Sequence, residues 1–228
     1  FAVEHHMRKQ SGTLRRGDIH VGKAAARITG DYAQKGDSMV LKMNFSGPGM
    51  AVEELTGMLP PLGIVLPNGS SLKGGTLTVA ASLAGPADKL NIDGTVSLNK
   101  TKLTGFDLGK KMAAIQKLAG MQAGPDTDIE TASANVHVTP AGTAADDIRF
   151  IVPTMGELTG AGAISPANAL DFKMTAKVHT SGAAAFIADT PIPFFVQGTS
   201  AEPVFKPDLK SIAKDKIKEI TVGEITTS

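Results

Sequence analysis

The stretch KLNIDGTVSLNK, residues 89–100, alternates apolar and polar side chains almost without a break. The apolar set is Leu90, Ile92, Val96 and Leu98, and the polar set is Asn91, Asp93, Thr95, Ser97 and Asn99. Because successive side chains of a β-strand point to opposite faces, this pattern predicts a strand with one buried face and one solvent-exposed face. Such strands are typical of antiparallel sheets.

The same alternation recurs along most of the chain. It occurs in residues 76–85, at Val136 and Val138, at Ile148, Phe150 and Val152, from Leu170 to Val178, and in the N-terminal third at 19–21, 28–32 and 40–45. Gly85-Pro86 and Ser165-Pro166 punctuate the runs as turns. The sequence therefore predicts a mainly β fold with at least ten strands. We expect them in one strongly curved, mostly antiparallel sheet, shaped like a groove or a half-barrel.

Three stretches depart from this period and predict about three short amphipathic helices as caps. They lie near residues 50–59, 107–119 and 208–220. In the second, Asp107 is a typical N-cap, and Leu108, Met112, Ile115 and Leu118 form one stripe. We expect this stripe to dock on an open end of the sheet.

The composition disfavours several classes of function. The 228 residues carry a net charge of +1 without a basic stripe, which disfavours nucleic-acid binding. The chain has no Cys, so disulfides and thiolate metal sites are excluded. Aromatic residues make up only 4%, which disfavours sites that stack their ligands on rings.

No residue pattern of a reaction centre or a metal site is present, so we predict a protein that is not an enzyme and has no cofactor or metal. The histidines (His5, His6, His20, His137 and His179) are scattered and lack partners at ligand spacing. The acidic run at Asp126, Asp128 and Glu130 lacks the glycine and the distal glutamate of a calcium loop. Neither GAGAIS nor NGSSLKGG completes a nucleotide-binding motif.

The expected sheet has more apolar surface than its helices can cover. Roughly twenty-five apolar side chains share one face, and three short helices about 10 Å across cover about a third of it. The face is therefore either an open groove for acyl chains or a closed core. The expected groove residues are Leu77, Val79, Leu90, Ile92, Val96, Phe150, Phe172 and Met174. A closed core would instead favour a structural scaffold that recruits a partner protein by its sheet edge.

Four ordered segments carry a likeness to a known family: LPPLGIVLPNGSSLKGGTLTVAASLAGP, GTVSLNKTKLTGFDLGKKMAAIQKL, PTMGELTGAGAISPANALDFKM and IPFFVQGTSAEPVFKPD. Together they resemble the AsmA-like family in its C-terminal region, and the likeness covers about residues 50–213. We therefore expect an AsmA-like β-groove domain over residues 50–228. Residues 1–49 would be an N-terminal strand segment that continues from an upstream region, so that 1–228 forms one continuous domain.

The resemblance implies a periplasmic protein attached to the inner membrane and involved in outer-membrane biogenesis. It also implies lipid transport along a β-groove, with a phospholipid or other acyl-chain lipid as ligand and an envelope protein as partner. The chain begins at Phe1 without a signal peptide. We expect the membrane anchor to lie upstream of Phe1.

Overall fold

Thirteen β-strands dominate the described part of the protein. The computed structural model describes residues 1–6, 10–60, 64–113, 124–178 and 191–213. The strands are β1 (Ala2–His6), β2 (Ser11–Val21), β3 (Ala24–Lys35), β4 (Ser38–Ala51), β5 (Ser71–Lys73), β6 (Thr76–Pro86), β7 (Asn91–Thr104), β8 (Thr127–Thr139), β9 (Gly142–Val152), β10 (Gly156–Ile164), β11 (Leu170–Val178), β12 (Ile192–Gly198) and β13 (Pro203–Pro207). The predicted mainly β fold with at least ten strands is confirmed.

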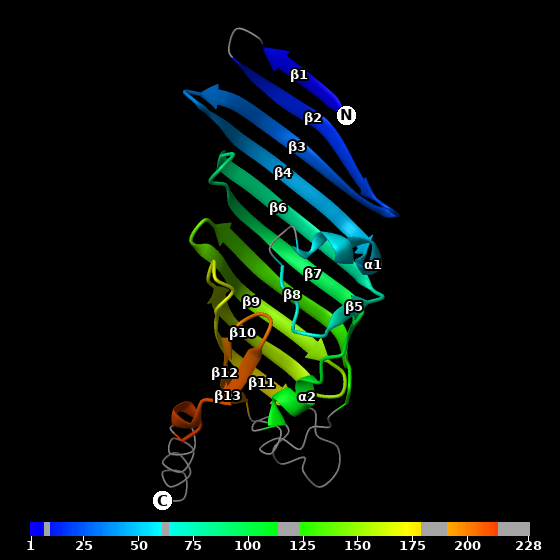
Figure 1. Ribbon diagram of the computed structural model, residues 1–228, viewed down its shortest axis with the longest axis vertical. Helices are drawn as coiled ribbons and strands as arrows, with labels where there is room; N and C mark the ends of the chain where they lie inside the picture. The colour runs from blue at the N-terminus through cyan, green and yellow to red at the C-terminus, as the bar shows by residue number, and fades with distance from the viewer. Residues whose placement is uncertain (7–9, 61–63, 114–123, 179–190, 214–228) are drawn as a thin grey trace, which may run out of the picture.

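All strands belong to one open sheet in which neighbours in the chain are neighbours in space. The order runs from β1 to β13, with β5 beside β7 off the main path, and every pair is antiparallel. Figure 1 shows the strands stacked along the long axis of the molecule. The position between residues 49 and 50 falls inside β4, which pairs with both β3 and β6.

Short helical segments occur where the sequence predicts them. The first is α1 (Val52–Leu55) followed by the 3-10 turn η2 (Thr56–Met58), and the second is α2 (Leu108–Lys111). The Asp107 side chain accepts a hydrogen bond from the Lys110 backbone N–H, as an N-cap does. Residues 209–213 are also helical. The remainder of the helices predicted over 107–119 and 208–220, with Ile115 and Leu118, lies outside the described residues.

The hydrophobic core lies at the C-terminal end of the sheet. We call the buried cluster the C-terminal core; its members are Phe106, Leu108, Met112, Val152, Met155, Leu158, Met174, Ala176, Ile192 and Phe194. Met112 is 0% exposed and Leu108 is 5% exposed. The described part of the α2 region therefore docks on this end of the sheet, as predicted. None of the described helices has the length and apolar character needed to cross a membrane.

Candidate functional site

Strand register places apolar side chains from several strands on one face of the sheet. Val79 of β6 pairs with Val96 of β7, and Val96 pairs with Ala134 of β8. Directly paired residues of antiparallel strands lie on the same side, and so do residues two apart in a strand. We define the central apolar face as Met43, Phe45, Leu77, Val79, Leu83, Ile92, Val96, Leu98, Val136 and Val138.

The central apolar face is only partly buried. All ten of its side chains are half-buried, in contrast to the members of the C-terminal core, none of which is more than 7% exposed. Within residues 77–83 of β6, 92–98 of β7 and 132–138 of β8, no acidic or basic residue occupies the same register. Apolar side chains that stay in partial contact with water offer contact area to an apolar ligand.

The eight groove residues predicted from the sequence divide into three groups. Four of them, Leu77, Val79, Ile92 and Val96, belong to the central apolar face. Three others lie in the C-terminal core region: Met174 is a member of the core, and Phe150 and Phe172 pack against it. Leu90 lies just before β7 and is half-buried. The structure thus places four of the predicted residues on the central apolar face and three in or against the C-terminal core, where only Met174 is buried.

The face has members that were not among the predicted groove residues. Leu83 pairs with Ile92, and Leu98 pairs with Leu77. Phe45 joins through its pairing with Ala81. Their alternation was visible in the sequence, but the alternation of one strand does not tell which residue of the next strand lies opposite.

The burial pattern of β7 changes beside Lys100, although the pairing of β7 with β8 keeps one register. Lys100 has a φ of 52°. Before it, the even-numbered residues of β7 point to the apolar face, whereas after it Thr101 is 2% exposed and Leu103 packs against the core. The buried Thr127 hydroxyl donates to the Phe106 carbonyl over 2.7 Å and accepts from the Leu108 N–H over 3.2 Å. These bonds hold the start of α2 on the core.

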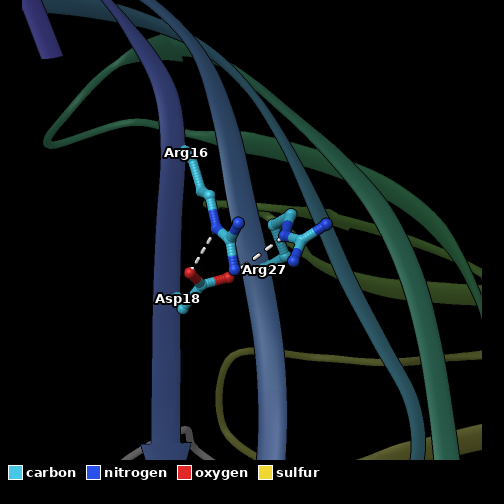
Figure 2. Close-up of polar contacts among 3 residues, drawn as sticks. All are labelled: Arg16, Asp18 and Arg27. Carbon is cyan, nitrogen blue, oxygen red and sulfur yellow. Dashed lines mark hydrogen bonds and ion pairs between the residues drawn. The ribbon is translucent and has the colours of Figure 1, made fainter. Parts of the chain in front are cut away.

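The opposite face of the sheet carries ion pairs. Figure 2 shows the guanidinium groups of Arg16 and Arg27 approaching the single carboxylate of Asp18, with distances of 2.5 and 3.1 Å from Nε to oxygen. These hydrogen bonds, that of Arg16 first, lower the pKa of the Asp18 carboxyl. Farther along the sheet, His137 pairs with Asp93. These ion pairs therefore lie on the face of the sheet opposite the central apolar face.

The acidic run and the histidines that the sequence offered as metal ligands have the following places in the structure. Asp126 accepts the Gly105 N–H, and Asp128 pairs with Lys102 over 3.1 Å. Within the described ranges, no three His, Asp or Glu residues gather as metal ligands would. His179 and the side chains of His5 and His6 lie outside the described part.

Two hollows of the described surface lie away from the central apolar face. One, of about 320 Å³, lies among β2, β3 and β4, with Asp31 and Lys42 in its wall. The other, of about 410 Å³, lies near the turns that follow β8 and β10, with His137 and Asp171 in its wall. Neither includes a residue of the central apolar face, which is a broad surface and not an enclosed cavity.

A segment from the first half of the chain crosses to the C-terminal strands. We call residues 64–70 the strap. The backbone N–H of Asn68 donates to the carbonyl of Ala201 over 2.8 Å, and its side-chain Nδ2 donates to Oε1 of Glu202 over 3.2 Å. In Figure 1 the strap is drawn in front of β7 and β8, and the turn between β12 and β13 lies beside it.

Comparison with models of known protein families, with curated proteins and with solved structures gives no match to this chain. The resemblance to the AsmA-like family stays a prediction.

Proposed function

We propose that the central apolar face binds lipid acyl chains and that the protein is a non-enzymatic lipid-handling module. One observation carries this proposal: the face spans several strands and stays only half-buried, whereas the C-terminal end of the same sheet has a buried core. A folded chain that only needed a core would gain free energy by covering this surface too. An acyl chain requires no more than apolar contact.

The energetics favour a long acyl chain over a small apolar molecule. Burial of a methylene contributes about 0.8 kcal/mol. About fifteen methylenes would thus contribute roughly 12 kcal/mol if fully covered, against an association cost of about 4–15 kcal/mol. A chain of a few carbons would not offset that cost. We therefore expect a phospholipid or another lipid with a long acyl chain as the ligand.

We further propose that the sheet is curved around the central apolar face, like a groove or a half-barrel. The strap supports this proposal. A Cβ on Gly105, just after β7, would lie 2.4 Å from the carbonyl oxygen of Gly69, whereas the preceding Asn68 bonds to the turn after β12. β7 and β12 are five steps apart in the sheet. On a flat sheet, five steps would span about 24 Å, at about 4.8 Å a step, which is more than two adjacent residues reach.

The cellular setting follows from the resemblance in the sequence. We propose that the protein acts in the periplasm, attached to the inner membrane by an anchor upstream of Phe1, and that it serves outer-membrane biogenesis as AsmA-like proteins do. The absence of Cys suits that oxidising compartment.

Native mass spectrometry of the purified chain and of three variants tests the function. Val79→Asp puts a charge on the central apolar face, where water can still reach it, so we expect a folded protein that has lost its bound lipid. Ala80→Asp is the matched control, because Ala80 is exposed on the opposite face of the same strand. Phe172→Glu should instead unfold the C-terminal region, since Phe172 packs against the core. Equal lipid occupancy in folded Val79→Asp and in the parent would reject the proposal.

A second candidate function is a scaffold that recruits a partner by strand addition. The two edge strands of the described sheet differ in their proline content. β13 begins with Pro203 and ends with Pro207, which offer no N–H to an added strand, whereas β1 contains no proline. This difference favours β1 as the docking edge. Val3 is 45% exposed on that edge. Val3→Pro would abolish partner capture if this candidate is right and would leave lipid occupancy unchanged.

A further inference from the structure

The two sides of the contact between the strap and the C-terminal strands are held very differently. The turn at 199–202 is fixed by backbone bonds between Thr199 and Glu202 in both directions, by the bond from Ser200 N–H to the Asn168 carbonyl, and by a bridge between Ala169 and Thr199. The described bonds of the strap, besides the two made by Asn68, are local ones: from Ile64 to Leu59 and from Ser70 to Pro67.

The chain around Asn68 can change direction at low cost. Gly69 follows Asn68 directly and has a φ of 75°, and Gly74 and Gly75, which follow β5, have φ values of 64° and 77°. Glycine adopts such conformations without the steric penalty of a side chain. Both hydrogen bonds of Asn68 join residues at the surface, where water competes for each partner. The strap is therefore a loosely held segment that meets a fixed turn.

The strap also lies where the two parts of the apolar surface meet. It passes in front of β7 and β8 in Figure 1, its Asn68 bonds to the turn after β12, and it leads into β5, which pairs with β7. Its Ile64 and Val65 are 47% and 41% exposed. These two apolar side chains are available to contact an acyl chain.

We propose that the strap is a gate over the lipid site, latched by Asn68 to Ala201 and Glu202. This inference rests on the proposed function. Opening of the latch frees the strap to lift about Gly69, so that an acyl chain enters or leaves the central apolar face. Closing the latch holds the chain in place. A gate of this kind changes the rates of uptake and release together.

A reversible cross-link tests the gate, because the chain contains no other Cys. Asn68→Cys with Ala201→Cys locks the strap when oxidised. Ala80→Cys with Thr95→Cys is the matched control, since these residues pair directly between β6 and β7 on the opposite face. Uptake of a fluorescent long-chain fatty acid and its release to empty vesicles are followed by stopped flow. We expect both rates to fall at least tenfold in the oxidised latch pair, to recover on reduction, and to stay unchanged in the control pair.

Variants of the latch itself give the opposite effect. Glu202→Ala removes the acceptor of the Asn68 amide and should speed exchange several-fold, whereas Glu202→Gln keeps an Oε1 acceptor and should exchange at about the parent's rate. If the parent binds the fatty acid but the oxidised latch pair exchanges as fast as the reduced one, the gate is refuted and the lipid site stands. If the parent binds no fatty acid, both proposals fall.

Discussion

Truncation of Met112 should separate the closed end of the sheet from its exposed centre. Met112 is 0% exposed in the C-terminal core, at the end of α2. Met112→Ala removes the buried thioether and leaves a cavity, and truncations of buried Leu, Ile or Met to Ala cost about 2–5 kcal/mol. We expect about 3 kcal/mol, since the neighbouring strands of the sheet restrict collapse of the site. Val79→Ala, at a half-buried position, should cost less than about 1 kcal/mol.

Urea unfolding followed by far-ultraviolet circular dichroism measures both variants against the parent. The comparison is valid if the dependence of the unfolding free energy on urea keeps the same slope in all three proteins. Leu209→Ala serves as a control, because Leu209 is 65% exposed and a surface truncation should fall within about 0.5 kcal/mol of the parent. A Met112→Ala protein as stable as the parent would refute the docking of α2. A Val79→Ala protein as destabilised as Met112→Ala would show that the centre of the sheet is a closed core.

Gly94→Ala should destabilise the sheet by about 1–3 kcal/mol in the same assay, because its Cβ would come within 2.5 Å of the Ala80 carbonyl oxygen. Gly57→Ala, whose Cβ meets nothing within 4 Å, should not destabilise, and equal stability of the two variants would contradict the packing around β7. Asp18→Asn should lower stability at neutral pH, since the ion pairs with Arg16 and Arg27 depress the pKa of Asp18 in the folded protein. That contribution is fully present above the unfolded pKa of about 3.9 and is lost as the pH falls through the lower folded pKa. If the difference in unfolding free energy between the parent and Asp18→Asn does not shrink in acid, this account is wrong.

Alternation within each strand made the β-architecture predictable. Residues 89–100 placed Ile92 and Val96 on one face, and β7 carries them there. Asp107 marked the start of α2 because an N-cap is a local device, which needs only the next turn of helix. These features depend on neighbours in the sequence, so the sequence alone revealed them.

Features that depend on distant residues were not predictable in the same way. Phe172 and Val79 show the same alternation, yet Phe172 packs against the C-terminal core and Val79 does not, because Phe106, Leu108 and Met112 of the α2 region pack only at that end of the sheet. Likewise, no pattern around Asn68 predicts its bonds to Ala201 and Glu202. Exposed polar residues are common in turns whether or not they bond to a distant segment. Which part of an apolar face stays uncovered is decided by tertiary packing.

Photocrosslinking with a long-chain fatty acid that carries a diazirine in its tail tests the central claim most directly. After irradiation, digestion and mass spectrometry, the account predicts adducts concentrated on peptides from β4, β6, β7 and β8, at residues of the central apolar face such as Val79 and Val96. An excess of unlabelled fatty acid should compete these adducts away. Adducts spread equally over both faces of the sheet, or not reduced by the competitor, would contradict the claim that the central apolar face is a lipid site.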